Sequence, residues 1–397
     1  MPGGRASGSD PSRPETGAGG PVARRAIAAP PMLPGFSVVR PLGSGGFADV
    51  FLYEQDLPRR VVAVKVLSSD TVSPAVLRAF NAEADILARL STHPSIVTIH
   101  LASIAADGRP YFVMEYCPDT LGARARRGPL PIAEALDAGV RIGGALESAH
   151  RAGLLHRDIK PSNLLVSSLG APVLADFGIA AALTISGDTS LAMSVPWSAP
   201  EVLQEQTTGT VPSEVWSLAA TIYTLLAGRS PFEVERRELN TRDQITRRVI
   251  AAKYVPTGRA DVPPRLEQAL ATAMSKSPER RYATAHALAE ELRWVQYELG
   301  LPPTTLEVAA PEWARAGGTI DLADERHRGE VVTVVKPDSR SAARERARLE
   351  AAEVDRDGLV IRDRRRGRNV APALIGAGVA VVVLVGMAVV LRAIGVL

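Results

Sequence analysis

Residues 156–163 read HRDIKPSN, and residues 174–178 read LADFG. A carboxylate such as Asp158 can orient a hydroxyl and accept its proton, and Lys160 can neutralise charge on a phosphoryl group. Asn163 offers an oxygen to a metal ion, and Asp176 offers a second one after an apolar run. Mg²⁺ prefers such oxygen ligands and shares them with phosphates. Taken alone, HRDIKPSN is also compatible with a polar surface turn.

Two segments upstream carry candidate phosphate-binding groups. Gly43, Gly45 and Gly46 lie between apolar strand-like runs, and a glycine-rich hairpin brings backbone N–H groups close to phosphate. No Gly-Lys-Ser/Thr follows, which excludes a Walker A loop, and the strand that follows argues against a dinucleotide-binding fingerprint. Lys65 ends an apolar strand and points inward only if an anion such as Glu83 pairs with it. On these two residues alone, solvent-facing side chains are the ordinary arrangement.

Short β-branched runs precede long helical segments in this chain. The runs at 38–39, 50–53, 61–64 and 111–114 predict strands. Residues 74–90 predict a helix that tolerates proline in its first turn. Residues 215–226 are apolar almost all round, which is typical of a helix buried in a large core. Strands first and helices later predict an α+β chain in two lobes.

Five motifs together resemble those of the bacterial eukaryotic-like (Hanks-type) Ser/Thr protein kinases. They occur in the family's order as Gly43-Ser44-Gly45, Val62-Ala63-Val64-Lys65, His156-Arg157-Asp158 with Asn163, Asp176-Phe177-Gly178 and Ala199-Pro200-Glu201. Each motif alone is only weakly specific, but the probability that all five occur in this order over about 160 residues by chance is negligible. The resemblance covers about residues 33–297. It implies a two-lobed protein kinase fold with a small β-rich N-lobe and a larger helical C-lobe.

The resemblance also implies roles for individual residues, with ATP as the phosphoryl donor and Mg²⁺, or Mn²⁺ in its place, as the metal. Asp158 would be the catalytic base, and Lys160 would neutralise the phosphoryl and mark a Ser/Thr preference. Lys65, paired with Glu83, would bind the α/β phosphates. The implied metal ligands are Asn163 and Asp176, and the implied ATP-binding residues are Leu42, Gly43, Ser44, Gly45, Gly46, Val50, Ala63, Lys65, the gatekeeper Met114 and the hinge residues Glu115 and Cys117.

Three positions depart from the family's pattern without removing a catalytic group. Ala48 replaces the third loop glycine, and its methyl is expected to restrict φ and reduce rather than abolish activity. Glu214 replaces the buried Asp that accepts backbone N–H bonds from the catalytic loop. Ser194 replaces the Thr that faces the catalytic Asp and Lys, and it keeps the hydroxyl. The resemblance further implies a structural ion pair between Glu201 and Arg281.

The loop between Phe177 and Ser198 holds several hydroxyl side chains. Arg157, beside the catalytic Asp, is a candidate phosphate partner. We expect phosphorylation at Thr189 or Ser190 to order this loop through charge-assisted bonds to Arg157. The alternative is a loop ordered by packing alone.

Composition limits the other function classes. The 397 residues carry 46 Lys+Arg and 43 Asp+Glu, and the net charge of +3 is too small to imply nucleic-acid binding. A hydrophobic content of 46% suits a globular chain with a good core. The single cysteine, Cys117, excludes an intrachain disulfide and a multi-cysteine metal site, and it fits a reducing compartment. We expect it to be a small buried residue rather than a reactive thiol.

Composition shifts divide the chain into five parts. Residues 1–32 predict a disordered tail, because Gly, Pro and small residues cannot bury enough apolar surface to offset ordering. Residues 33–299 form the predicted kinase domain, and the mixed-charge residues 300–369 predict a polar juxtamembrane linker. Residues 370–391 contain no charge and are long enough to cross a bilayer as a helix. Residues 392–397 would be a short tail on the far side.

The flanks of the apolar segment predict its orientation. Residues 362–368 read RDRRRGR, and basic residues flank the cytoplasmic side of membrane helices. The sequence therefore predicts a single-pass cell-membrane protein with a cytoplasmic kinase domain. The arginines can also hold anionic lipid headgroups, or act only as a topology signal. Small residues at 376–378 and 386 could pack two such helices into a homodimer.

Three functions compete at this point. The leading interpretation is an active membrane-anchored kinase that acts on Ser and Thr of protein substrates and phosphorylates its own activation loop. The second is a catalytically weak or silent ATP-binding scaffold, against which the intact Lys65, Asp158 and Asn163 argue. The third is a small-molecule phosphotransferase of related fold, against which the segment 199–201 argues. The sequence names neither the substrates nor the activating signal.

Overall fold

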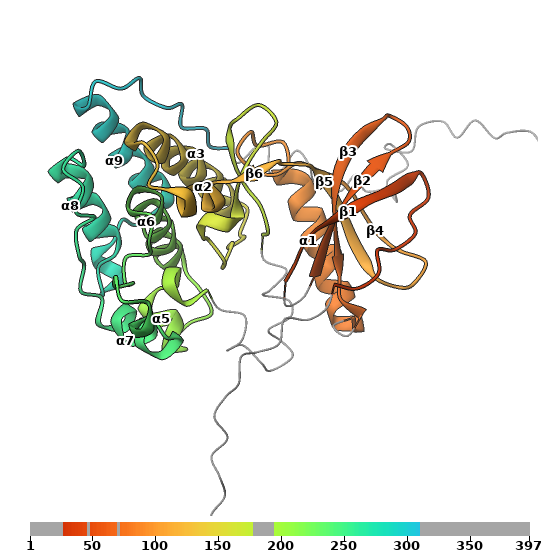
Figure 1. Cartoon of the computed structure of the whole chain (residues 1–397), viewed down its shortest axis with the longest axis horizontal. Helices are drawn as coiled ribbons and strands as arrows, with labels where there is room; N and C mark the ends of the chain where they lie inside the picture. Colours follow the sequence, from red (N-terminus) through yellow and green to blue (C-terminus); the bar gives the residue numbers. More distant parts are fainter. Residues whose placement is uncertain (1–26, 46–47, 70–71, 178–193, 310–397) are drawn as a thin grey trace, which may run out of the picture. The chain divides into compact units, whose positions relative to one another are not determined.

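The small lobe is built on an antiparallel sheet with strand order β1-β2-β3-β5-β4. The computed structural model describes residues 27–45, 48–69, 72–177 and 194–309 (Figure 1). The strands of this sheet are β1 (Phe36–Ser44), β2 (Ala48–Gln55), β3 (Arg60–Leu67), β4 (Ile99–Ile104) and β5 (Pro110–Glu115). All four predicted strand runs lie inside these elements.

Helix α1 (Pro74–Leu90) has the bounds that the sequence predicts. It begins with proline in its first turn, and the Ser73 side chain caps it by accepting a hydrogen bond from the backbone N–H of Val76. Its apolar face packs against β5, where the rings of Phe80 and Phe112 lie 4.5 Å apart. Packing of this face, rather than helix propensity alone, therefore fixes α1 on the sheet.

The large lobe is helical and holds the main core. Its helices are α2 (Leu121–Arg127), α3 (Ile132–Arg151), α5 (Pro200–Leu203), α6 (Val211–Ala227), α7 (Arg242–Ala251), α8 (Pro264–Ala273) and α9 (Ala285–Glu298). Helix α6 begins at a reciprocal cap between Thr210 and Ser213, and the predicted apolar run within it is largely buried. Trp216 of this run has no exposed surface and stacks on Phe232. The two lobes expected from the sequence, a small β-rich one and a larger helical one, are confirmed.

A small sheet of order β6-β7-β8 lies at the edge of the large lobe and carries the two decisive motifs. Its strands are β6 (Asp119–Thr120), β7 (Leu164–Val166) and β8 (Pro172–Leu174). Strand β7 begins directly after Asn163, and β8 ends two residues before Asp176. Because β7 and β8 pair antiparallel, with Leu164 opposite Leu174, the end of one motif lies beside the start of the other.

Two backbone segments beyond the predicted domain bounds are held against the lobes. Residues 28–31 accept hydrogen bonds from the small lobe. The Tyr53 hydroxyl donates to the carbonyl of Pro31 at 2.7 Å, and the Arg109 side chain donates to the carbonyl of Ala29 at 2.9 Å. Residues 301–309 lie along α3. The sequence assigned 28–31 to a disordered tail and 301–309 to a linker. Both segments are bonded largely through main-chain atoms, which leave no pattern in the sequence.

Several predictions fall outside the described residues. They are the side chain of Glu83, Gly46, the candidate phosphosites Thr189 and Ser190, most of the tail and linker, the apolar segment 370–391 and the tail 392–397. Among the described residues, no helix is long and apolar enough to cross a membrane.

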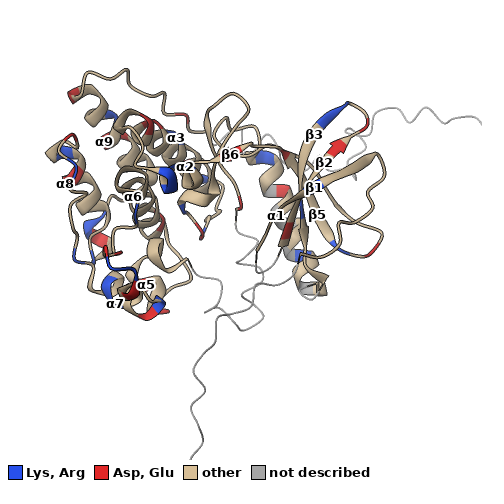
Figure 2. Cartoon of the chain, viewed as in Figure 1, with Lys and Arg blue, Asp and Glu red and all other residues tan. Residues whose placement is uncertain are grey.

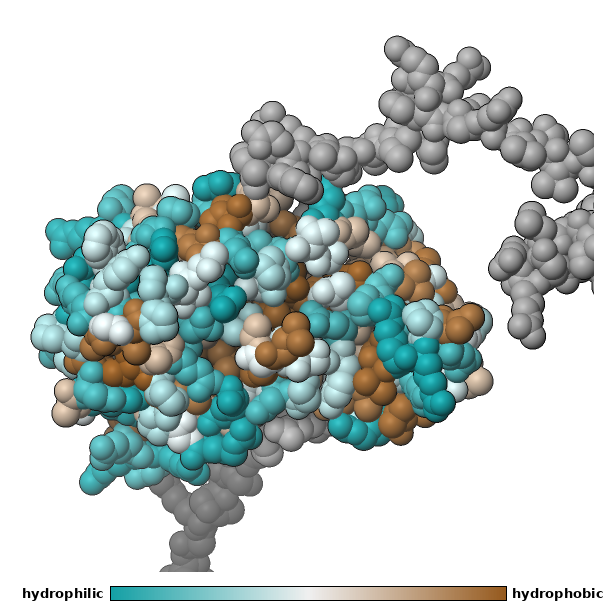
Figure 3. All heavy atoms as spheres, turned by 90° about the horizontal axis from the view of Figure 1, so that it is seen from above, coloured by the Kyte–Doolittle hydropathy of each residue, from teal (hydrophilic) through white to brown (hydrophobic). Residues whose placement is uncertain are grey.

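The surface of the described lobes mixes charge and apolar patches. Helices α7 and α8 each carry both basic and acidic residues (Figure 2). Hydrophilic residues cover much of the face drawn in Figure 3 and separate smaller hydrophobic patches on it. Trp294 and Tyr297 of α9 are among the exposed apolar side chains, at 55% and 53% exposure.

Candidate active site

Sheet register brings the predicted nucleotide-binding residues together in the small lobe. Gly43 of β1 lies opposite Val50 of β2, and Val50 lies opposite Lys65 of β3. Ala63 of β3 lies opposite Met114 of β5. Residues far apart in the sequence therefore line one stretch of neighbouring strands, as a nucleotide site requires. Leu42 and Ser44 lie at the end of β1, and Glu115 ends β5.

Ala48 fits its place without strain. It is the first residue of β2, it is buried, and its carbonyl accepts a hydrogen bond from Gly45 N–H at 2.8 Å. Its φ is not among the positive values found in the described residues. The methyl group therefore occupies a backbone conformation open to any residue, and the expected restriction of φ costs nothing here.

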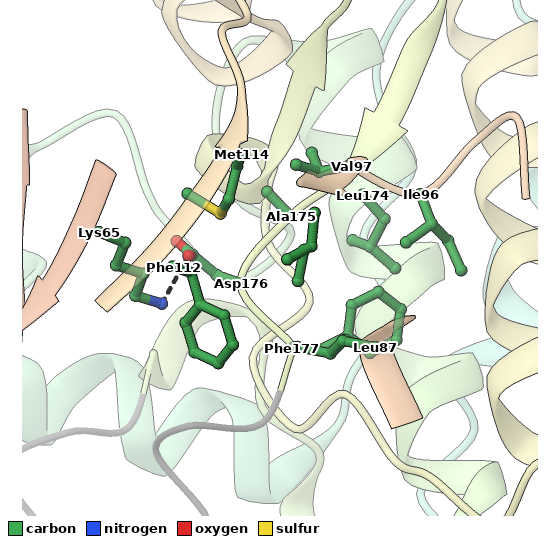
Figure 4. Close-up of a pocket in the computed structure, with 11 residues that line it drawn as sticks. Lys65, Leu87, Ile96, Val97, Phe112, Met114, Leu174, Ala175, Asp176 and Phe177 are labelled. Atoms are coloured by element: carbon green, nitrogen blue, oxygen red, sulfur yellow. Dashed lines mark hydrogen bonds and ion pairs between the residues drawn. The ribbon is translucent and has the colours of Figure 1, made fainter. Parts of the chain in front are cut away.

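Apolar side chains line a pocket whose charged groups are Lys65 and Asp176 (Figure 4). Lys65 Nζ contacts Asp176 Oδ1 at 2.7 Å. Glu83 lies in α1, but its side chain lies outside the described residues, so the predicted Lys65–Glu83 pair stays a prediction. The remaining lining residues are Leu87, Ile96, Val97, Ile99, Phe112, Met114, Leu174, Ala175 and Phe177.

Asp176 is held ionised in an unusual backbone conformation. The Lys65 ammonium is the main cause that lowers the pKa of its carboxyl below the usual range. Its φ of 62° is in the left-handed region, as is the φ of 64° at Arg157. Such strained residues cluster at functional sites, where surrounding structure holds them in place. Both aspartate motifs therefore carry one strained residue each.

Three polar side chains converge on Asp158. Lys160 Nζ donates to Asp158 Oδ2 at 2.6 Å and to Ser194 Oγ at 2.9 Å. The Ser194 hydroxyl donates to Asp158 Oδ1 at 2.7 Å, and Asn163 Nδ2 donates to Asp158 Oδ2 at 3.1 Å. The hydroxyl kept at Ser194 thus makes the contact that the family resemblance implies. The carboxylate is about a quarter exposed, which leaves it open to a substrate hydroxyl.

Asn163 and Asp176 fit a shared Mg²⁺ by the chemistry of their donors. The Asn163 amide nitrogen donates to Asp158, which leaves the amide oxygen as the group available to a metal ion. The backbone carbonyl of Asn163 accepts from Ala175 N–H at 2.9 Å, which ties the two ligands to each other. Within the described residues no cluster of three or more His, Cys, Asp or Glu side chains could hold a metal. Two protein oxygens completed by phosphate oxygens and water suit Mg²⁺.

His156 joins the two motifs from inside the core. Its Nδ1 accepts the N–H of Asp158 at 3.2 Å, so Nε2 carries the proton and donates to the carbonyl of Ala175 at 2.8 Å. Its ring packs on Phe177 at 4.7 Å. Complete burial lowers the pKa of His156, which keeps the imidazole neutral and both bonds in place.

Glu214 supports the strained backbone at Arg157. Its Oε1 accepts the Arg157 N–H at 2.6 Å, and its Oε2 bonds His150 Nε2 at 2.7 Å. Both side chains are buried. The extra methylene relative to the family's Asp is therefore accommodated with the catalytic-loop bond retained.

The expected ion pair between Glu201 and Arg281 is present and bidentate. Arg281 donates to both carboxylate oxygens at 2.6 and 2.8 Å, and its side chain has no exposed surface. It also donates to the carbonyls of Pro212 and Ser275 and lies 5.0 Å over the Trp216 ring. These contacts join the start of α5 to the segment before α9.

Cys117 is half-buried rather than fully buried as the sequence predicts, and it packs with apolar neighbours, among them Val97 and Val173. Burial raises the pKa of its thiol to about 12. The thiol therefore stays protonated, and we expect iodoacetamide at pH 8 to react at least about 100-fold more slowly than with the urea-unfolded chain. Intact-mass measurement over time checks this. Alkylation at the unfolded rate in the native chain would contradict a half-buried, inert thiol.

Sequence reasoning left some site residues without a role. The motif alone gives His156 no role, and its link to Ala175 is visible only in the structure. His150 bonds Glu214, which lies 64 residues further along the chain, and no local sequence pattern predicts such a pair. The importance of Gly122 in α2 could have been inferred from one sequence signal, which is a glycine inside a helix. A Cβ there would lie 2.8 Å from the backbone of Pro161, so glycine lets α2 approach the catalytic segment.

Comparison with known proteins agrees with this geometry. A family model described as protein kinase domain matches residues 36–293. The serine/threonine-protein kinase PknK of Mycobacterium tuberculosis is 41% identical over 275 residues, which cover 67% of this chain and 24% of PknK. PrkC of Bacillus subtilis is 33% identical over 264 residues, 65% of this chain and 40% of PrkC. The chain thus spans a quarter to two-fifths of these relatives.

A solved structure shows the same fold. The crystal structure of the Mycobacterium tuberculosis PknI kinase domain has a TM-score of 0.52 and 27% identity, and the match covers 68% of this chain and 98% of that one. The family match takes in both lobes, the sheet that carries Lys65, and the helical lobe that carries Asp158 and Asp176. The chain therefore belongs to the protein kinase domain family.

Proposed function

We propose that this protein is an ATP-dependent serine/threonine protein kinase. One observation carries the proposal: Asp158, Lys160, Ser194 and Asn163 form a closed hydrogen-bonded cluster beside the Lys65–Asp176 pair. A silent scaffold needs no such cluster. The relatives PknK and PrkC carry serine/threonine-protein kinase in their names, which supports the same acceptor class.

The cluster accounts for phosphoryl transfer without a covalent enzyme intermediate. Asp158 orients the substrate hydroxyl and accepts its proton as the hydroxyl oxygen bonds the γ-phosphorus. The bond from the γ-phosphorus to the bridging oxygen breaks, and ADP leaves with that electron pair. Lys160 neutralises charge on the transferred group, and Lys65 orients the α/β phosphates. Bound at Asn163 and Asp176, Mg²⁺ supplies charge neutralisation at the phosphates.

Acceptor specificity tests the proposal directly. Peptides identical except for Ser, Thr or Tyr at one position are incubated with the full chain and Mg-ATP. We expect phosphate on the Ser and Thr peptides and none on the Tyr peptide. Transfer to a small hydroxylated metabolite but to no peptide would favour a small-molecule phosphotransferase instead.

We propose that phosphorylation in the loop before Ser194 activates the enzyme. Arg157 supports this, because its guanidinium is exposed beside the catalytic Asp and can pair with a phosphate. We expect the double variant Thr189→Ala/Ser190→Ala to lose at least about tenfold in kcat/KM, since phosphate-dependent ordering of the loop would be lost. Thr184→Ala is the matched control. Full activity of the double variant would show that packing alone orders the loop.

We propose that residues 370–391 anchor the protein in the cell membrane, with the kinase domain cytoplasmic. Support comes from the uncharged run and from the arginines at 362–368, which could also contact anionic lipid headgroups. The variant Val381→Arg/Val382→Arg should move the chain from the membrane pellet to the supernatant, whereas Val381→Leu/Val382→Leu should not. Equal recovery of both double variants in the membrane pellet would contradict the proposed membrane anchor. Crosslinking in vesicles tests the homodimer that the small residues of this segment permit.

A further inference from the structure

Residues 304–309, here called the strap, follow α9 and are fastened to α3. The Thr304 N–H donates to Gln296 Oε1 at 2.9 Å, and the Thr304 hydroxyl donates to Asp137 Oδ1 at 2.9 Å. At the other end, Ala309 N–H donates to Ser148 Oγ at 2.9 Å. Thr304 is buried, unlike its neighbour at 305. Both ends of the strap are therefore fixed by specific bonds.

The strap runs parallel to α3 for about three turns. From Thr304 to Ala309, an extended chain covers about 16 Å, and from Asp137 to Ser148 the helix also covers about 16 Å. Figure 1 shows the chain after α9 passing α3 in this way. Because strap residues 304–309 and helix residues 137–148 cover the same length, the strap is an extended segment that lies along the helix.

Gly144 makes room for the strap at its centre. A Cβ at this position would lie 2.2 Å from the carbonyl oxygen of Glu307, which is an impossible contact with main chain. Glycine inside a helix is otherwise destabilising relative to alanine. The helix thus carries an unfavourable residue where the strap crosses it.

The same carbonyl of Glu307 binds His93 in the small lobe. His93 Nε2 lies 3.0 Å from this oxygen, and His93 Nδ1 accepts the N–H of Ser95 at 3.1 Å. Because Nδ1 is an acceptor, Nε2 carries the proton and donates to the strap. His93 is buried in the α1–β4 loop, residues 91–98, which directly follows α1.

That loop is in turn bonded to the active site on two sides. Val97 N–H donates to the carbonyl of Leu174 at 3.0 Å, and Leu174 N–H donates to the carbonyl of Ser95 at 2.9 Å. Leu174 ends β8, two residues before the metal ligand Asp176. Thr98 and the hinge residue Glu115 exchange two bonds: Glu115 N–H donates to Thr98 O, and Thr98 N–H donates to Glu115 Oε1, each at 2.9 Å.

We propose that the strap is a positioning element for nucleotide binding. The strap fixes the α1–β4 loop in place beside α3 through His93. The loop in turn bonds the hinge residue Glu115 and strand β8, which precedes Asp176. Release of the strap then weakens Mg-nucleotide binding without touching the catalytic groups. This inference rests on the proposed function only in assigning the pocket to ATP. The alternative role of the strap is only to cover the apolar surface beside α3, since Leu306 packs on the main core.

Two variants of the full chain release the strap by different means. Gly144→Ala places a methyl group against the Glu307 carbonyl. Thr304→Val removes the two bonds of the Thr304 hydroxyl, which donates to Asp137 Oδ1 and accepts from Gln296 Nε2 at 2.8 Å. Thr305→Val is the control for Thr304→Val, because it makes the same change at the exposed neighbour. Gly139→Ala is the control for Gly144→Ala. Its added methyl group meets the side-chain ends of Leu292 and Ile222, on the face away from the strap.

Hydrogen exchange and nucleotide affinity decide between the two roles. In both releasing variants we expect amide exchange in 91–98 to rise about three- to tenfold, and the Kd for a fluorescent Mg-ADP analogue to rise by a similar factor. KM for ATP should follow, with kcat within about twofold. The controls should match wild type.

Faster exchange confined to 301–309, with unchanged Kd, would overturn the proposal and leave only the covering role. If the wild-type chain binds no Mg-ADP, the proposed function fails instead. Exchange in 91–98 still shows in that case whether the strap positions the loop.

Discussion

Asp158→Asn is expected to lower kcat by about 10²–10⁴-fold, because the amide cannot accept the proton of the substrate hydroxyl. The substitution keeps the shape of the side chain, but it removes the charge that Lys160 and Ser194 bond. Mg-ATP affinity should stay within about threefold of wild type, since Lys65 and Asp176 are untouched. Steady-state kinetics and nucleotide titration on the same preparation give both numbers.

The matched control is Asp243→Asn, on the exposed first turn of α7. It should leave kcat unchanged, and both variants should unfold at the wild-type denaturant concentration. A loss of ATP affinity in Asp158→Asn as large as the loss of kcat would mean that the residue supports binding rather than proton transfer.

Glu201→Gln is expected to destabilise the large lobe by about 3–5 kcal/mol, because it leaves the buried Arg281 guanidinium without its counter-charge. The side chain of Arg281 has no exposed surface, so water cannot replace the lost carboxylate. Urea unfolding followed by tryptophan fluorescence measures the change, since Trp216 lies under the guanidinium.

A surface pair provides the comparison for that substitution. Glu298→Gln breaks a contact of 2.8 Å with Arg265, but Glu298 is 46% exposed and should cost far less. The double variant Glu201→Gln/Arg281→Met removes the buried charge itself and should recover part of the stability. Equal losses for Glu201→Gln and Glu298→Gln would show that burial does not govern this pair.

Much of the fold could be predicted because it depends on local patterns. The apolar run of α6 and the proline-led α1 carry their own periodicity and end signals, and both helices lie where the sequence places them. Asp158, Asn163 and Ser194 could be assigned together because motif order fixes them relative to one another. The unstrained fit of Ala48 could not be predicted, because its φ depends on where β2 begins rather than on the motif.

The rest depends on contacts that residue types do not encode. Apart from the Thr304 hydroxyl, the strap is held by the main-chain carbonyl of Glu307 and the N–H groups of Thr304 and Ala309. Every residue has such a carbonyl, and every residue but proline has such an N–H group. Its one sequence trace is Gly144, a glycine inside a helix, which is ambiguous without the opposing chain. The Lys65–Asp176 contact likewise joins two motifs that the sequence assigned to separate partners.

Phosphosite mapping of the full chain, incubated with Mg-ATP beside the Asp158→Asn variant, tests the central claim most directly. An active Ser/Thr kinase predicts phosphate on Ser or Thr residues of the wild-type chain only, with equal ATP binding by both proteins. ATP bound by the wild-type chain with no phosphate transferred to itself or to any peptide would contradict the claim. The chain would then be a nucleotide-binding scaffold, with Glu214 as the first position to restore to Asp.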